Sequence, residues 1–434
     1  MDLAVLNAGL FLLVIASLAP AALYVIGKIK DPFHPLLFVG TLSYFIAAHR
    51  LVVNQKTHFL LLPEDAYAAY VWVALLAVLG VYWGWRLGRS RVVKQYSLSY
   101  WQSEFQISYL LLAAMTCTMI GIVICFLIRS DQIVIASATH GMGYVADLKL
   151  LWITGAILWV QIFILCPQYR SIASLMFFAS LIPPIERFLS YGQRGDTFRV
   201  AVILELFYLM RAKRPSKAVF ITAAVILGLV LGTLERTRAI VNSGDAKNRF
   251  EAISKVIPSF FAQADTIPDT GGEDVFGAAA MRTVQDTGTY GYGRSLTIGL
   301  VGRFLPRKFF PDKDAWTTFH GGYDATMIQS ATGLTISGGA ACSGFAESFL
   351  ELSWFSPIIW VGIGYLYRKL WDRALAGDLR FQGFMVGFSI AILYGISQAL
   401  IVAEVNIIYV LLPLFLIYRV AHTRSEVHLL PAPA

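Results

Sequence analysis

Residues 67–91 decide the fold class of this chain, and they read YAAYVWVALLAVLGVYWGWRLGRSR. The segment 67–85 has no charged side chain, and a helix needs about 20 such residues to cross the hydrocarbon core of a bilayer. Arg86, Arg89 and Arg91 follow at once, and such basic residues collect on the cytoplasmic side. The stretch predicts a transmembrane helix that ends in the cytoplasm.

The composition extends this interpretation to the whole chain. Of its 434 residues, 57% are hydrophobic and 14% are charged, whereas soluble proteins have about 25% charged residues. The mean hydropathy is +0.63. The four cysteines show neither metal-ligand spacing nor a paired framework. The net charge of +8 fits basic cytoplasmic loops, so we expect no nucleic-acid partner. The chain is predicted to be an all-α, polytopic membrane protein.

About eleven hydrophobic runs are candidate spans, and the seventh is short. They cover approximately residues 4–26, 36–53, 67–85, 108–128, 149–166, 171–189, 198–211, 218–234, 347–367, 383–402 and 405–420. Five basic clusters lie between or beside these runs, and with eleven spans all five fall on the same, cytoplasmic side. The N-terminus is then outside and the C-terminus inside.

This count divides the chain into three parts. Spans 1–8 occupy residues 1–234, with short external loops at 129–147 and 190–197. Residues 235–346 form a large external, periplasmic loop with short amphipathic helices. Residues 347–434 hold spans 9–11 and a cytoplasmic tail. The large loop is rich in arginine, including Arg282, although external loops usually lack basic residues. This excess predicts binding of an anionic substrate.

The loop before the short span is one candidate anion site. Arg194 and Arg199 stand where a helix begins, beside two glycines. An arginine fork matches phosphate oxygens, and the first turn of a helix offers free N–H groups. Alternatively, Arg194 pairs with Asp196 and both flank the span. Glu205 lies deeper in this span, where it would support Arg199 or Arg187, or form a buried structural pair.

The large loop supplies a second set of cations. Residues 292–313 contain an apolar run that predicts a short helix on the membrane surface. The basic residues around it would bind diphosphate or sugar, namely Arg294, Arg303, Arg307 and Lys308. The alternative is a basic interfacial helix whose side chains extend to lipid headgroups.

A hydroxyl acceptor would need a general base, and three residues are candidates for this chemistry. His320 precedes two glycines in a polar loop, although a lone loop histidine also occurs as an ordinary surface residue. Glu347 and Glu351 lie one turn apart where the ninth span begins. They would act as the base, contact sugar hydroxyls or balance the arginines. The chain has no nucleotide, zinc or serine-nucleophile motif, so we expect no cofactor and no metal.

These motifs together resemble the bacterial repeat-unit polymerases of O-antigen and exopolysaccharide synthesis. The resemblance rests on the Arg-Gly loop at 190–199, the segment Arg303-Phe-Leu-Pro-Arg-Lys308 and Glu347 at the start of a span. It implies a GT-C-like glycosyltransferase of the bacterial inner membrane. Arg194 would be catalytic together with His320 and Glu347. A span count of eleven departs from the even counts common in these families.

The resemblance also implies the substrate and the partners. Oligosaccharide repeat units on undecaprenyl pyrophosphate would be polymerised on the external face, with arginines on the diphosphate leaving group. Membrane lipid is an expected partner, and a chain-length regulator protein is a further candidate. An O-antigen ligase would show the same arginine-rich loop. A transporter of lipid-linked oligosaccharides is another alternative, expected to have charges within its spans and internal repeats.

Overall fold

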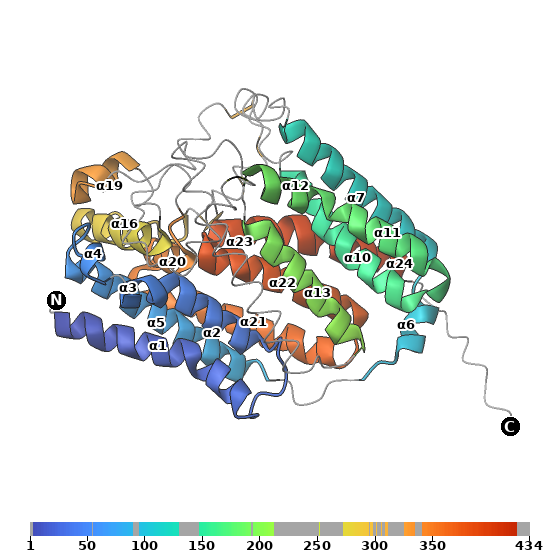
Figure 1. Ribbon diagram of the computed structural model, residues 1–434, viewed down its shortest axis with the longest axis horizontal. Helices are drawn as coiled ribbons and strands as arrows, with labels where there is room; N and C mark the ends of the chain where they lie inside the picture. The colour runs from blue at the N-terminus through green and yellow to red at the C-terminus, as the bar shows by residue number, and fades with distance from the viewer. Residues whose placement is uncertain are drawn as a thin grey trace.

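The chain forms a bundle of long helices, shown in a computed structural model (Figure 1). The structure describes residues 3–53, 55–89, 95–129, 147–191, 194–211, 272–294, 325–334 and 341–422, together with the isolated positions 251, 296, 297, 301, 305, 309 and 310. Within these ranges the regular secondary structure is helical and no strand occurs. The prediction of an all-α polytopic membrane protein is confirmed.

The described helices include seven that are long and apolar enough to cross a membrane. An eighth span results if the bent pair α20–α21 is counted as one. The principal helices are α1 (Leu3–Val25), α2 (Pro35–Ser43), α3 (His49–Val53), α4 (Gln55–His58), α5 (Glu64–Leu87), α6 (Leu98–Glu104), α7 (Ile107–Arg129), α10 (Leu151–Leu165), α11 (Arg170–Ser180), α12 (Ile182–Tyr191), α13 (Arg194–Arg211), α16 (Glu273–Thr287), α19 (Ala325–Thr332), α20 (Gly344–Leu352), α21 (Pro357–Leu375), α22 (Leu379–Ser397), α23 (Leu400–Asn406) and α24 (Leu412–Ala421).

Two predicted spans are divided in the structure. The run 171–189 becomes α11 and α12, which meet beside Pro183 and Pro184. The run 347–367 is broken by a bend of 115° between the segments Gly344–Phe355 and Pro357–Leu375. Ser353 adopts a positive φ of 52° and Pro357 cannot continue the preceding helix. The predicted ninth span is therefore bent, and run 218–234 lies outside the described residues, so the count of eleven spans stays a prediction.

Contacts between distant segments define one end of the bundle, called here the basic end. The backbone N–H of Tyr96 donates to Ala376, and that of Gln106 donates to Ala421. The Tyr208 hydroxyl donates to Asp31 at 2.5 Å. These links lie beside the positions of Arg211, Arg380 and Arg419 in the chain. Assigning the basic end to the cytoplasm stays a prediction from the charge bias.

The opposite end, called here the outer end, carries α16, α19 and α20 (Figure 1). Helix α16 packs on α5, and α20 contacts α5, α22 and α23. Helix α5 has Glu64 and Asp65 in its first turn and Arg86 in its last turn, an arrangement that complements the helix dipole. The described part of the predicted external loop therefore sits on the end of the bundle that lies away from the basic clusters.

The core of the bundle is built on a close contact between α5 and α21. Gly80, Gly84 and Gly88 repeat every fourth residue and line one face of α5. A Cβ atom on Gly84 would overlap the carbonyl oxygen of Val361. Gly364 makes the reciprocal approach to Val81 on α5. Small residues let helix backbones approach in this way within membranes, where van der Waals packing drives association.

A substitution series tests this contact. We expect Gly84→Ala to lower the free energy of unfolding by about 1–3 kcal/mol, because the added methyl group overpacks a backbone-to-backbone contact. The matched control is Gly362→Ala on α21, where a Cβ atom would meet nothing within 4 Å. Unfolding of the purified proteins in mixed micelles by dodecyl sulfate measures both. Equal stability of the two variants would contradict the assigned contact.

Candidate functional site

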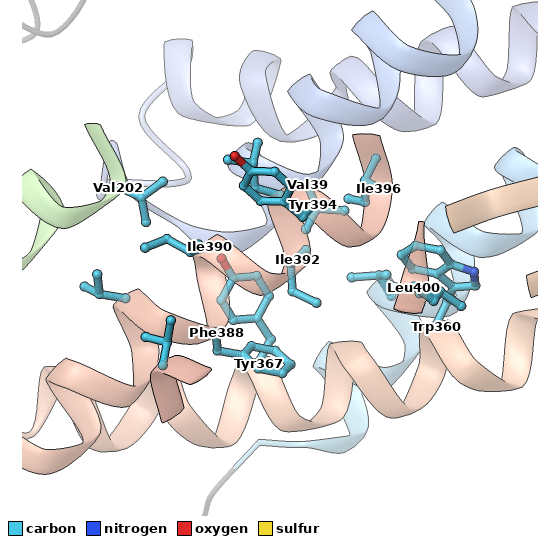
Figure 2. Close-up of a cluster of buried hydrophobic side chains, with 14 of the residues drawn as sticks. Val39, Val202, Trp360, Tyr367, Phe388, Ile390, Ile392, Tyr394, Ile396 and Leu400 are labelled. Carbon is cyan, nitrogen blue, oxygen red and sulfur yellow. The ribbon is translucent and has the colours of Figure 1, made fainter. Parts of the chain in front are cut away.

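The candidate site lies at the outer end, where α13 begins against the last turn of α22. Gly195 lies so close to Tyr394 that a Cβ atom would overlap the tyrosine hydroxyl. Figure 2 shows the Tyr394 ring next to Val39, with Ile396 further along α22 and Leu400, at the start of α23, next to Trp360. The first turn of α13, which ends the predicted anion loop, is thus packed against α22.

Arg199 is held in a defined position by this arrangement. Its side chain is 5% exposed, and its guanidinium carbon lies 4.1 Å from the centre of the Tyr394 ring. Its Nη2 donates to Asn406 Oδ1 over 3.4 Å, and Asn406 Nδ2 donates to the Val402 carbonyl. A desolvated contact between a cation and an aromatic face contributes about 2 kcal/mol. The predicted anion-binding Arg199 therefore carries a fixed positive charge at the outer end.

Glu347 is buried and connects two helices. It is 1% exposed, and its Oε2 accepts hydrogen bonds from the backbone N–H groups of Leu400 and, at 3.3 Å, Ile401. Its carboxylate thereby caps the N-terminus of α23, where negative charge is stabilised by the helix dipole. Its predicted role as a base stays a prediction, and the structure gives it this additional bonding role.

Glu351 lies one turn further along α20 and faces a different neighbour. It is 2% exposed, and Gly291 lies directly against its carboxylate, since a Cβ atom there would be 2.5 Å from both carboxylate oxygens. The side chain of Arg294 is exposed, and its backbone N–H donates to the Gly291 carbonyl at 3.0 Å. Both predicted residues thus lie next to the turn at Gly291, Glu351 against Gly291 and Arg294 at the end of the turn.

Glu205 is buried in α13 at 5% exposure. It lies close enough to the Tyr367 hydroxyl to act on it electrostatically, and that hydroxyl shares a hydrogen bond of 2.7 Å with Ser389. Tyr367 occupies the interior of the apolar cluster in Figure 2. The predicted role of Glu205 in supporting Arg199 or Arg187 stays a prediction.

The other predicted site residues are only partly covered by the structure. Arg187 and Arg194 lie in α12 and α13, and the structure gives their backbone alone. His320, Arg303, Arg307 and Lys308 lie outside the described residues. Within the described ranges, no cluster of three or more His, Cys, Asp or Glu side chains is arranged to hold a metal ion.

Sequence reasoning missed the docking of α16, which fastens part of the large loop to the bundle. Asp274 is 1% exposed, and its Oδ2 lies 2.9 Å from His58 Nε2, while Arg50 Nη1 is 3.9 Å from its Oδ1. Most of the helix between Asp274 and Val284 is buried. The available signal was the small, apolar composition of residues 275–284 next to two acidic residues.

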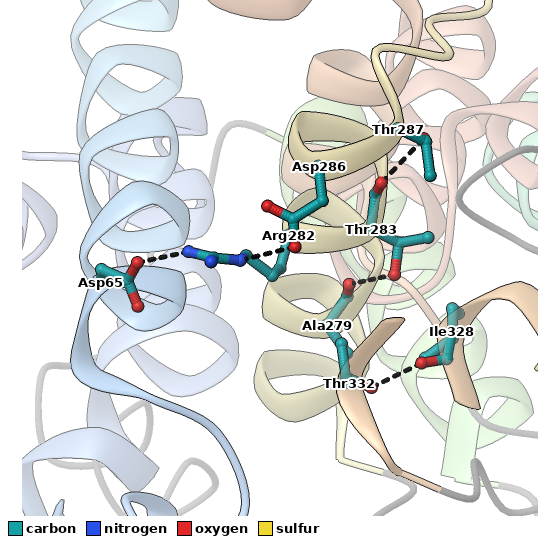
Figure 3. Close-up of polar contacts among 8 residues, drawn as sticks. All are labelled: Asp65, Ala279, Arg282, Thr283, Asp286, Thr287, Ile328 and Thr332. Carbon is teal, nitrogen blue, oxygen red and sulfur yellow. Dashed lines mark hydrogen bonds and ion pairs between the residues drawn. The ribbon is translucent and has the colours of Figure 1, made fainter. Parts of the chain in front are cut away.

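Arg282 belongs to this docking contact. We had grouped it with the loop arginines that would bind an anion, but it forms ion pairs with Asp65 on α5 and, at 2.8 Å, with Asp286 on α16 (Figure 3). The hydrogen bond that Arg282 donates to Asp286 and the negative charge of Asp65 raise the pKa of Arg282 above its usual value. Its charge is used to attach α16 to α5.

No family model matches this chain, and comparisons with curated proteins and with solved structures give no match either.

The docking of α16 predicts unequal effects at its two acidic contacts. We expect Asp274→Ala to cost about 3 kcal/mol or more of unfolding free energy, because it removes the buried carboxylate that His58 and Arg50 contact. Asp286→Ala should cost about 1 kcal/mol or less, since Asp286 is 43% exposed. Dodecyl sulfate titrations measure both, and similar costs would argue against a buried docking contact.

A second pair of variants separates the two roles of Glu347. Glu347→Gln keeps an acceptor oxygen for α23 and should remain folded, whereas Glu347→Leu removes the acceptor of the buried Leu400 N–H, at about 1–3 kcal/mol, and of the partly buried Ile401 N–H. Melting temperatures measure the capping role. A glutamine variant that melts like the wild type but has lost its activity would assign Glu347 to the chemistry as well.

Proposed function

We propose that this chain polymerises oligosaccharide repeat units carried on undecaprenyl pyrophosphate, on the external face of the bacterial inner membrane. The observation that carries the proposal is the fixed charge of Arg199 at the outer end, stacked on Tyr394 and bonded to Asn406. Arg194 begins the same helix, and the exposed Arg294 lies at the same end. A cation held in place as Arg199 is, with further arginines at the same end, suits an anion that stays attached to the membrane.

The chemistry of the proposal is a GT-C-like transfer that needs neither nucleotide nor metal. An acceptor hydroxyl attacks the anomeric carbon of the growing chain and forms the new glycosidic bond. The bond from that carbon to the pyrophosphate oxygen breaks, and undecaprenyl pyrophosphate leaves with the electron pair. The hydroxyl proton passes to a base, for which His320 and Glu347 are the candidates. Arginines that stabilise the charge on the diphosphate lower the barrier.

Glu205 favours a second candidate function. A buried carboxyl within a membrane-spanning bundle is expensive and commonly marks a substrate or ion pathway. A transporter of lipid-linked oligosaccharides would therefore also account for the described charges. A reconstituted assay distinguishes the two functions, since a polymerase lengthens the glycan and a transporter moves an unchanged glycan across the bilayer. An O-antigen ligase would instead transfer the chain to lipid A core in the same assay.

The test uses proteoliposomes supplied with the host's lipid-linked repeat unit. We expect Arg199→Ala to lower the rate of chain growth about 100-fold, as removing one preorganised donor does in other enzymes. Arg199→Lys keeps the charge but loses the planar fork, and should retain part of the rate. Chain growth at the wild-type rate in the alanine variant would exclude Arg199 from the site.

Tyr394 provides a matched test of how Arg199 is held. Tyr394→Phe keeps the aromatic face and should retain chain growth, whereas Tyr394→Leu removes the stacking contact and should lower the rate about tenfold. Thermal melting of each variant controls for folding. If the leucine and phenylalanine variants are equally active, the ring does not position Arg199 for the reaction.

A further inference from the structure

The turn that follows α16 contains a tyrosine with an unusual backbone conformation. Tyr292 has a positive φ of 51° and its side chain is 80% exposed. Gly291 and Gly293 flank it, and Gly293 also has a positive φ of 79°. A bulky residue in this left-handed region is an outlier, because its Cβ atom approaches the backbone too closely.

Contacts with α20 hold this turn in place. The Gly291 N–H donates to the Leu350 carbonyl of α20 at 2.8 Å, and the Arg294 N–H closes the turn onto the Gly291 carbonyl. Tyr290 packs against Phe349 with ring centres 5.9 Å apart. Gly291 must remain a glycine, since it lies against the buried Glu351 carboxylate. The backbone therefore holds Tyr292 in one position.

Tyr292 carries two costs, and its ring forms a tilted pair with the Tyr290 ring, with ring centres 6.3 Å apart. The left-handed backbone costs about 1–2 kcal/mol, and an 80% exposed ring gains little from burial. Asparagine or glycine would fill the same position with less strain. Strained residues of this kind cluster at sites that clamp ligands. The ring is therefore best explained by something that binds on it.

We propose that Tyr292 is a stacking platform for a sugar ring of the acceptor oligosaccharide. Tyrosine offers a broad, rigid contact face at a low entropy cost, with a hydroxyl at its edge. A pyranose ring presents C–H groups on its face and hydroxyls around its rim, which complements such a side chain. Arg294 follows two positions later with an exposed side chain, and its donors reach hydroxyl or carboxylate groups on the same saccharide.

The position of the turn fits an acceptor subsite. It is bonded to α20, which also carries Glu347 and contacts α22 and α23. Arg199 is held by Tyr394 of α22 and Asn406 of α23. The sugar platform and the proposed diphosphate site therefore belong to the same end of the bundle. The choice of an oligosaccharide as ligand rests on the proposed function, whereas the platform itself rests on the turn.

Saturation-transfer NMR tests the platform with the full-length protein in detergent. The probe is the free repeat-unit oligosaccharide, released from its lipid carrier by mild acid. We expect Tyr292→Phe and Tyr292→Trp to retain binding, and Tyr292→Ala to weaken it at least tenfold, about 1.4 kcal/mol. Tyr292→Asn should lose binding equally while its melting temperature stays the same or rises, because asparagine tolerates the left-handed region.

Tyr109→Ala is the matched control. Tyr109 is also an exposed tyrosine, at 47%, but it begins α7 at the basic end. Unchanged binding in the Tyr292→Ala and Tyr292→Asn variants would overturn the inference, and would favour Tyr292 as an aromatic anchor at the membrane surface. A wild-type protein that gives no transfer signal from the oligosaccharide would overturn it too.

The NMR binding experiment and the proteoliposome assay of chain growth, taken together, separate the inference from the proposed function. If the wild type binds the oligosaccharide through Tyr292 but does not lengthen lipid-linked units, the glycan platform is supported and the polymerase proposal fails. If the wild type lengthens the units and Tyr292→Ala does so with an unchanged KM for the acceptor, the polymerase stands and the platform is wrong. A raised KM with an unchanged kcat supports both.

Discussion

The close approach of α5 and α21 is the constraint on which the described bundle depends. These two helices share the most extensive contact among the described elements, and glycines on both sides allow their backbones to meet. Helix α5 also carries α1 along its side and receives α16 at its first turn. In a membrane no hydrophobic force draws helices together, so close packing of this kind must supply the association. Because α16 docks on α5, the packing of α5 against α21 also sets the position of the outer end.

The outer end consists of buried charges whose partners come from distant parts of the chain. Asp274 meets His58, Glu347 meets the first turn of α23, and Arg199 meets Asn406. Burying a charge is expensive unless it is paired and hydrogen-bonded. These pairs therefore determine the geometry in which the helices dock as well as the stability of the docking. In this way the described part of the chain holds these buried charges in defined positions at the outer end, where we propose that the anionic substrate binds.

The sequence predicted much of the bundle because uniformly apolar runs such as 67–85 identify spans without knowledge of their neighbours. It missed the break between α20 and α21, since Ser353 and Pro357 interrupt a run that is apolar on both sides. It also missed the cap made by Glu347, whose partner lies 53 residues away in the chain. Arg199 was identified as a site candidate from its place before a short span. Its neighbours Tyr394 and Asn406 could not be, because only tertiary packing brings them together.

The bond between Glu347 and α23 has a mechanical consequence. Helix α20 supports the turn of Tyr292 through Leu350, and it holds the start of α23 through Glu347. Asn406, at the end of α23, in turn holds Arg199. One continuous series of contacts thus joins the turn to the arginine, the kind of physical network through which coupling travels. Because α20 is bonded to both the turn and α23, a shift of α20 would change the positions of both together.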